Sequence, residues 1–96
     1  MPPPLIQLEI ITPRGAALNT AARLVELPGL EGRLGVMAGH QPGAVALASG
    51  TVRVLHADDR SEEWSTGSGF ATVTPELVTL LVQSAARLAE PARREN

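Results

Sequence analysis

The segment from Leu27 to Pro42 constrains the fold more than any other part of the chain. It holds glycines at positions 29, 32, 35 and 39 and a proline near each end. Each glycine inside a helix costs about 1 kcal/mol relative to alanine, so this spacing excludes a helix. Glycine reaches positive φ angles and lets a second backbone approach closely, which is typical of tight turns between short strands. The segment and its continuation therefore predict short strands around Leu34–Val36 and Ala44–Leu47.

Alternation of apolar and polar residues predicts further strands. Ile6, Leu8 and Ile10 alternate with Gln7 and Glu9, which is the period of a half-buried strand. The other expected strands, separated by Gly, Pro or Asp, are Ala22–Leu27, Thr51–His56, Glu62–Thr66, Phe70–Thr74 and Leu77–Val82. A hairpin loop at Ala57–Arg60 would bring Trp64 beside Val52 and Val54.

Short strands broken about every ten positions are typical of β-sandwiches and barrels. We therefore expect an all-β protein, a flattened β-sandwich of about ten short strands over residues 5–83. Residues 1–4 would form a Pro-rich, extended lead-in. Ser84–Glu90 is rich in alanine, begins with serine and precedes Pro91, which predicts at most one short helix before a disordered tail that ends at Asn96.

The charge and cysteine content exclude several classes of protein. The 96 residues carry a net charge of −2, which does not indicate binding to nucleic acid or to an anionic lipid surface. The chain has no cysteine, so disulfides and thiolate metal sites are excluded. No apolar stretch approaches the roughly 20 residues of a membrane span, and the N-terminus lacks the pattern of a signal peptide. We expect a soluble cytoplasmic domain.

Candidate catalytic groups are few. A zinc site takes three or four protein ligands, and the two histidines, His40 and His56, form no such cluster with the acidic residues at any usual spacing. The chain has no GxGxxG motif, no phosphate-binding loop with its lysine and no nucleophile elbow. We predict no catalytic residue, no metal and no cofactor. A hydrolase or metal site built on His56 with Asp58 or Asp59 remains an open alternative.

The order of residues in the glycine-rich segment resembles that of a known family. From Pro28 to Pro42 it reads Pro-Gly-x-Glu-Gly-x-Leu-Gly-x-x-x-Gly-His-x-Pro, which is similar to the signature of epsilon subunits of F-type ATP synthases. Further segments resemble parts of that family in the same order, namely residues 8–15, 23–27, 50–54, 67–73 and 78–81. Several motifs in the right order are much more specific than one short pattern.

The resemblance implies a non-catalytic rotor subunit of the central stalk, which binds the gamma subunit and the c-ring and couples ion translocation to ATP synthesis or hydrolysis. It implies no nucleic acid partner, no direct lipid insertion and a peripheral position at the cytoplasmic face of the bacterial inner membrane. The residues implied to contact the c-ring are Glu31, Arg33, Met37, His40, Gln41 and Pro42. Those implied to contact the gamma subunit are Gly67, Ser68, Gly69, Phe70 and Thr72.

The chain departs from the family pattern at Arg33, where many relatives carry an acidic residue, and at Ala38 and Gly43, which replace a proline and a leucine. Relatives usually continue into a C-terminal helical hairpin associated with inhibition of ATP hydrolysis, whereas this chain ends at Asn96. We therefore expect a short form that couples but does not inhibit.

The alternatives stay open at this point. Without the resemblance, His40 is better explained as satisfying a local backbone group, and Glu31 and Arg33 as solvated charges or a weak surface pair. A free-standing β-sandwich that binds a peptide or a ligand is a further interpretation, which would need an apolar pocket or an open sheet edge.

Overall fold

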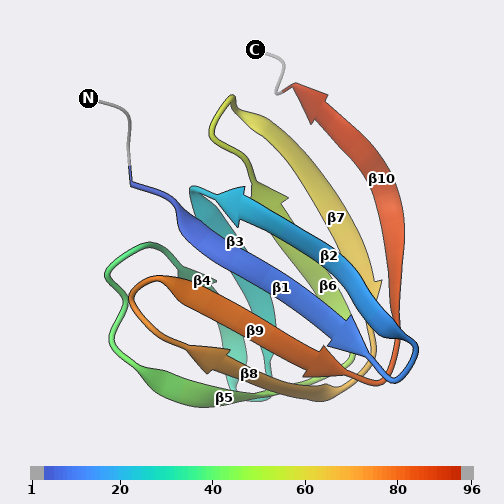
Figure 1. Cartoon of the computed structure of the whole chain (residues 1–96). Coiled ribbons are helices and arrows are strands. Elements are labelled where there is room, and N and C mark those ends of the chain that lie inside the picture. Colours follow the sequence, from blue (N-terminus) through green and yellow to red (C-terminus); the bar gives the residue numbers. More distant parts are fainter. Residues whose placement is uncertain (1–3, 94–96) are drawn as a thin grey trace.

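The computed structural model describes residues 4–93, which form ten strands and no helix (Figure 1). The strands are β1 (Ile6–Thr12), β2 (Gly15–Ala22), β3 (Leu24–Gly29), β4 (Gly32–Val36), β5 (Gly43–Leu47), β6 (Gly50–Leu55), β7 (Arg60–Thr66), β8 (Gly69–Val73), β9 (Leu77–Val82) and β10 (Ala85–Arg93). They form one curved sheet in the order β10-β7-β6-β3-β5-β8-β9-β1-β2, and β4 pairs with β3. The predicted all-β fold of about ten strands is confirmed.

The sheet folds over on itself between β3 and β5. β3 pairs with β6 from Leu24 to Glu26, and its last residue, Gly29, then pairs with Leu47 of β5. The ladder to β6 stops before Pro28, which has no N–H to donate. The Pro28 carbonyl instead accepts from Ala48 N–H at 2.8 Å, beyond the end of β5. The layer containing β6, β7 and β10 therefore faces the layer containing β5, β8, β9, β1 and β2 (Figure 1).

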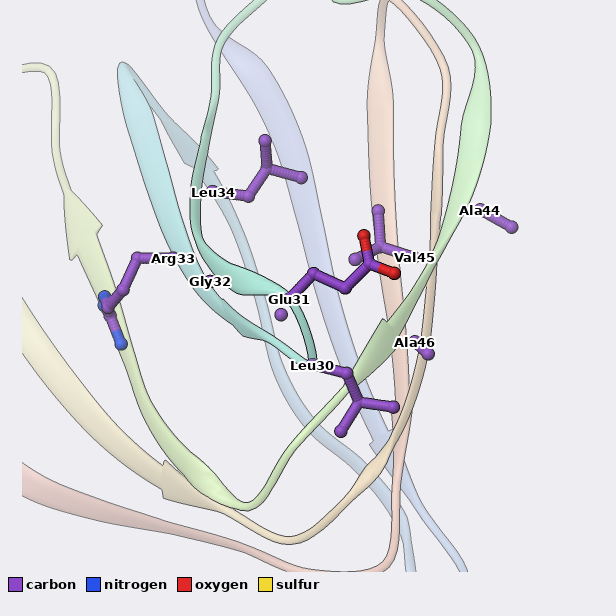
Figure 2. A pocket seen from close by; sticks show the side chains of 9 residues that line it. Leu30, Glu31, Gly32, Arg33, Leu34, Ala44, Val45 and Ala46 are labelled. Carbon is purple, nitrogen blue, oxygen red and sulfur yellow. The ribbon is translucent and has the colours of Figure 1, made fainter.

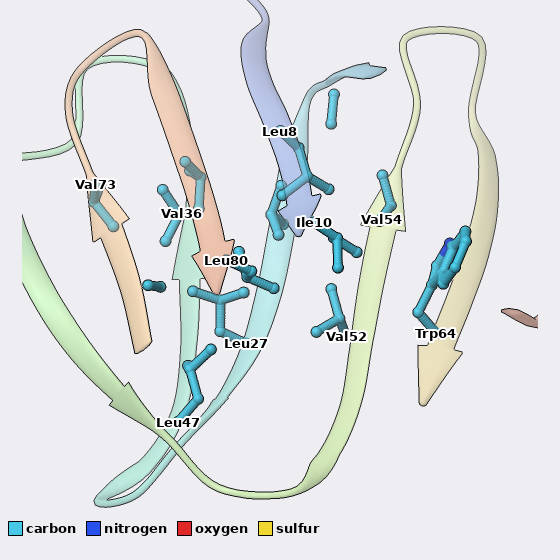
Figure 3. Close-up of a cluster of buried hydrophobic side chains, with 14 of the residues drawn as sticks. Leu8, Ile10, Leu27, Val36, Leu47, Val52, Val54, Trp64, Val73 and Leu80 are labelled. Carbon is cyan, nitrogen blue, oxygen red and sulfur yellow. The ribbon is translucent and has the colours of Figure 1, made fainter. Parts of the chain in front are cut away.

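An aliphatic core fills the space between the two layers (Figure 3). The alternation that predicted β1 is confirmed, because Ile6, Leu8 and Ile10 are fully buried. The other buried apolar residues are Ala22, Val25, Leu27, Val36, Leu47, Val52, Val54, Trp64, Ala71, Val73, Val78, Leu80 and Val82. Each buried aliphatic side chain contributes about 1.5–3 kcal/mol relative to an exposed one, so the many small contacts together hold the sandwich.

Two elements differ from the sequence predictions. β2 was not expected, since GAALNTAA has few residues that favour strands. It forms because its backbone pairs with β1 from Ile6 opposite Ala22 to Thr12 opposite Gly15. A turn at Pro13 and Arg14 joins the two strands, and Gly15 has a φ of 120°.

The helix expected at Ser84–Glu90 is wrong: Ala85–Arg93 forms β10 instead. β10 pairs with β7, with Ala85 opposite Thr66 and Arg87 opposite Trp64. The register shifts twice along β10, between Arg87 and Ala89 and again between Ala89 and Ala92. Pairing with a long strand therefore outweighs the helix propensity of an alanine-rich segment.

The sandwich accordingly extends past the expected boundary at residue 83. Ala92 and Arg93, which we expected in a disordered tail, belong to β10. The rest of that tail, residues 94–96, and residues 1–3 of the Pro-rich lead-in lie outside the described residues.

Candidate subunit interfaces

The hairpin of β3 and β4 carries the first group of predicted interface residues. Leu30 and Glu31 form its turn, between Gly29 and Gly32, which pair with each other. A Cβ on Gly29 would lie 2.6 Å from the Gly32 carbonyl oxygen, and Gly32 has a φ of 133°. Both positions therefore need glycine, and this explains why the sequence spacing predicts a turn here.

Beside this hairpin, a groove of about 470 Å³ separates β4 from β5 (Figure 2). Its lining residues are Gly29, Leu30, Glu31, Gly32, Arg33, Leu34, Ala44, Val45 and Ala46. Glu31 extends across the groove toward Val45, whereas Arg33 extends the other way, toward β6 (Figure 2). Leu30 is 67% exposed at the end of the groove. The groove is thus mainly apolar, with one carboxylate projecting into it.

Arg33 contacts the chain's own backbone. Its Nη1 donates to the Thr51 carbonyl of β6 at 2.8 Å, and its Nη2 lies 3.7 Å from Oε1 of Glu26 on β3. Glu31 makes no such contact with any residue in the described part of the chain, and it is exposed. Glu31 and Arg33 therefore do not form the weak surface pair that was one interpretation of the sequence. Arg33 contacts Thr51 and Glu26 instead.

The remaining residues predicted to contact the c-ring lie at the other end of β4. The loop from Met37 to Pro42 is fixed by Gly39 N–H, which donates to Pro75 at 2.9 Å, and by His40 N–H, which donates to Met37 at 3.1 Å. The His40 Nδ1 lies 2.8 Å from the Gln41 carbonyl, as expected for a ring that satisfies a local backbone group. At about 3.3 Å per strand residue, Glu31 and Met37 lie roughly 20 Å apart along the strand. The predicted surface is an elongated rim along β4.

The residues predicted to contact the gamma subunit lie on β8 and on the turn before it. Phe70 is 62% exposed on the outer face of the sheet, and Thr72 is exposed on the same strand. Phe70 pairs with Ala46 of β5 on one side and with Leu81 of β9 on the other. These side chains, unlike the neighbouring glycines, are available to a partner.

Gly67, Ser68 and Gly69 build the turn that positions Phe70. Gly67 N–H donates to the Ser84 carbonyl at 3.0 Å, and the Ser68 carbonyl accepts from Gln83 N–H at 3.1 Å. A Cβ on Gly69 would lie 1.9 Å from the Leu81 carbonyl oxygen, so the strands could not approach as they do. Gly67 and Gly69 therefore shape this surface by allowing the close backbone contacts that position Phe70, and not through side chains of their own.

The apolar surface around Phe70 includes residues that the sequence analysis did not name. Leu81 is 49% exposed and pairs in parallel register with Ile11 of β1. A shallow hollow of about 370 Å³ lies here, lined by Ile11, Thr12, Pro13, Gly69, Phe70, Leu81, Val82 and Gln83. The sequence did contain a signal for Leu81. Side chains alternate between the two faces of a strand, and because Val78 and Leu80 of β9 point inward, Leu81 points outward.

The alternative site at His56 has a different arrangement from the one considered. His56 Nε2 lies 2.6 Å from Oε2 of Glu62 on β7. Asp58 and Asp59 pair with arginines instead, Asp58 with Arg60 at 2.7 Å and Asp59 with Arg23 at 2.5 Å. Within residues 4–93 there is no group of three or more His, Asp or Glu side chains that could hold a metal ion.

The hairpin loop between β6 and β7 also shifts one ionisation. Arg60 N–H donates to Asp58 Oδ1 at 3.2 Å, and the Arg60 guanidinium lies beside the same carboxyl. This backbone hydrogen bond, followed by the nearby charge, lowers the pKa of Asp58 below its ordinary value. The loop is thus held by the ionised form of Asp58.

In the described part of the chain, no helix could cross a membrane.

Comparison with known proteins gives one consistent family. Residues 5–88 match the family described as "ATP synthase, Delta/Epsilon chain, beta-sandwich domain". The chain is 42% identical over 80 residues to the ATP synthase epsilon chain of Magnetococcus marinus, covering 83% of this chain and 58% of the relative. It is 36% identical over 88 residues to the epsilon chain of Granulibacter bethesdensis, covering 92% of this chain and 65% of the relative. The chain therefore spans about three fifths of the length of these relatives.

Solved structures show the same fold. A chain of the Euglena gracilis mitochondrial ATP synthase, from a structure with OSCP, F1 and the c-ring, superposes with a TM-score of 0.83 at 24% identity, over 88% of this chain and 54% of that one. A chain from the central stalk and c-ring of the Tetrahymena thermophila mitochondrial ATP synthase gives 0.70 at 12% identity, over 84% and 65%. The family match spans β1 to β9 and the start of β10. The chain therefore belongs to the family of epsilon subunits of F-type ATP synthases and corresponds to their β-sandwich domain.

Proposed function

We propose that this chain is a non-catalytic rotor subunit of the central stalk, which binds the gamma subunit and the c-ring and so couples ion translocation to ATP synthesis or hydrolysis. The observation that carries the proposal is the family match over residues 5–88, which spans nearly the whole described sandwich. The structural relatives come from assemblies whose descriptions name F1, the central stalk and the c-ring. Relatives from bacteria favour a peripheral position at the cytoplasmic face of the inner membrane.

Two separate surfaces suit two partners. The rim along β4 carries Glu31 at one end and Met37, His40, Gln41 and Pro42 at the other, and we assign it to the c-ring. The outer face around Phe70 and Thr72 is apolar in its centre, and we assign it to the gamma subunit. A close-packed sandwich suits a component that transmits torque, because a dense core transmits strain.

Binding to the purified cognate gamma subunit tests the proposal directly. We expect the two chains to elute together from a size-exclusion column, and the pair to be retained on detergent-solubilised c-ring. Separate elution of the two chains at concentrations well above micromolar would contradict the proposed function.

Reconstitution tests the coupling role of this 96-residue polypeptide. Residues 4–93 contain no helix, so the polypeptide supplies the sandwich alone in its described part. Added to an epsilon-depleted synthase, it should restore ion-driven ATP synthesis without suppressing ATP hydrolysis. Strong suppression of hydrolysis by this polypeptide would refute the expected absence of an inhibitory role.

A second candidate, a free-standing module that binds an extended peptide, is favoured by one observation. Within residues 4–93, β4 pairs only with β3, so its other edge lies open beside the apolar groove. Open edges of this kind accept an added strand. Pull-down from a lysate separates the two functions: a rotor subunit recovers gamma and c subunits together, whereas a module recovers another single partner.

A further inference from the structure

Glu31 and Arg33 were both predicted to contact the c-ring, but the fold gives them different surroundings. Two residues apart on one strand, they would share a face. Glu31 belongs to the turn, however, and Arg33 is in β4, so their side chains point to different sides of the hairpin (Figure 2). Glu31 lies over the groove, and Arg33 reaches the outer surface of β6.

Arg33 bridges a place where the backbone ladder is interrupted. It stands directly opposite Pro28 in the pairing of β3 with β4. On its other edge β3 pairs with β6 only as far as Glu26, because Pro28 cannot donate to a neighbouring strand. The Arg33 guanidinium crosses this point and donates to the Thr51 carbonyl at 2.8 Å. A side chain thus supplies the donor that the backbone lacks.

Close packing between β3 and the start of β6 leaves these two strands little freedom. A Cβ on Gly50, at the start of β6, would lie 2.9 Å from the Pro28 Cβ. Glu26 Oε1 lies 3.7 Å from Arg33 Nη2 and holds the guanidinium from the side of β3. Arg33 therefore connects β4, β3 and β6 across one short stretch of surface.

β4 is an edge strand, like β2 and β10, so a side-chain connection adds to its few backbone partners. It pairs with β3 alone, and its other edge has no neighbouring strand among the described residues. The turn has one further backbone anchor, Leu30 N–H to the Ala46 carbonyl at 3.0 Å. An edge strand with few partners opens locally at low cost in free energy. Arg33 is the side chain placed to suppress that opening.

We propose that Arg33 is a positioning residue for the c-ring surface: it fixes β4 and the hairpin turn, so that Glu31 presents its carboxylate to the partner, and does not itself contact the ring. This inference rests on the proposed function. It also explains how a basic residue is accommodated on this rim, because its charge is directed to Thr51 and Glu26 and away from Glu31.

The test compares Arg33→Ala, Arg33→Lys and Glu31→Gln in the full chain by two measurements. The first is hydrogen exchange at the amides of residues 32–36, and the second is retention on detergent-solubilised c-ring. We expect Arg33→Ala to raise exchange about tenfold, as befits the loss of one charged hydrogen bond, and to weaken retention. Arg33→Lys should restore part of both, since its ammonium still reaches one acceptor. Glu31→Gln should weaken retention and leave exchange unchanged.

Two results would overturn the inference while leaving the function intact. One is unchanged exchange in Arg33→Ala, and if retention is nevertheless weakened, Arg33 is a direct contact. The other is raised exchange in that variant with full retention on the ring. If the unmodified chain is not retained on the ring, the proposed function fails, and the positioning role toward the ring fails with it. The exchange measurement is independent of the ring, so the two failures are distinguishable.

Discussion

Trp64 donates its indole Nε1–H to Oε1 of Glu62 at 2.8 Å, two residues earlier on the same face of β7. Glu62 is only 3% exposed, and its other oxygen lies 2.6 Å from Nε2 of His56. Arg87 of β10 completes the cluster, with its Nε 3.3 Å from Glu62 and its guanidinium over the Trp64 ring at 5.3 Å. One buried carboxylate thus joins β7 to the end of β6 and to β10.

Replacing Glu62 by alanine should strongly destabilise the fold. The change leaves the Trp64 indole N–H without its acceptor in a buried site, and His56 and Arg87 lose their contacts with Glu62. We expect a loss of about 2–4 kcal/mol in the free energy of unfolding, measured by urea denaturation. Glu63→Ala is the matched control, since Glu63 has the opposite parity on β7, and it should cost less than about 1 kcal/mol. Equal losses in the two variants would contradict the role of the cluster.

Replacing Arg87 by alanine should loosen β10. The variant loses the contact over the Trp64 ring and the partial pairing with Glu62, worth about 1 kcal/mol for a side chain that is 40% exposed. Hydrogen exchange at residues 85–88 should rise, and the Trp64 emission should shift to longer wavelength as water reaches the ring. Leu88→Ser, at an exposed position on the same strand, should leave both signals nearly unchanged.

Gly69→Ala should disrupt the start of β8. The added Cβ would lie 1.9 Å from the Leu81 carbonyl oxygen, so β8 and β9 would have to separate. We expect a loss of about 3 kcal/mol or more in the free energy of unfolding. Gly43→Ala, at the start of β5, meets nothing within 4 Å and should be nearly neutral. A neutral Gly69→Ala would show that the two strands do not approach as described.

The surface around Phe70 can be tested apart from stability. Phe70→Ser removes an apolar side chain that is 62% exposed, so the melting temperature should change little. Its affinity for the gamma subunit, measured by titration calorimetry, should fall about tenfold or more, as for the loss of a central aromatic contact. Ser65→Ala, on an exposed position of β7 in the other layer, should keep full affinity. Unchanged binding of the Phe70 variant would remove this face from the proposed interface.

Asp58 should remain ionised at lower pH than an ordinary aspartate. The Arg60 backbone hydrogen bond, and then its charge, lower the pKa in the folded state. The ionised form therefore stabilises the fold above the ordinary pKa range, and this contribution is lost as the pH falls through the lowered folded pKa, below roughly pH 4. A carboxyl NMR titration of Asp58 measures the shift. In Arg60→Ala the pKa of Asp58 should move only part of the way back toward the ordinary range, because the backbone N–H of residue 60 remains. An unmoved curve would exclude the guanidinium charge as a contributor.

Local patterns in the sequence predicted most of the strands. Alternation placed Leu8 inside and Glu9 outside, and the same parity placed Trp64 next to Val52, its partner in the observed register. The glycine spacing predicted the turn between β3 and β4, where Gly29 and Gly32 are both required. The family signature could be read because these turn residues stand at fixed distances along the chain.

The sequence predictions failed where a distant strand decided the outcome. β2 and β10 have compositions that favour other structures, yet each pairs with a strand already set by its own pattern, β1 and β7. The parity that buried Trp64 also buries Glu62, and only the approach of His56 and Arg87 shows how that carboxylate is satisfied.

The sequence by itself determined the periodicity, the turns and the family, because each of these depends on residues close together in the chain. Tertiary structure decided which charges are bound within the chain itself. Arg33 is turned from the rim by a carbonyl 18 residues further along, and Glu31 is left over the groove. The positions of Glu31 and Arg33 in the sequence do not reveal which strand will lie beside each of them. Only the folded sheet therefore shows that Arg33 is hydrogen-bonded within the chain and that Glu31 is left accessible.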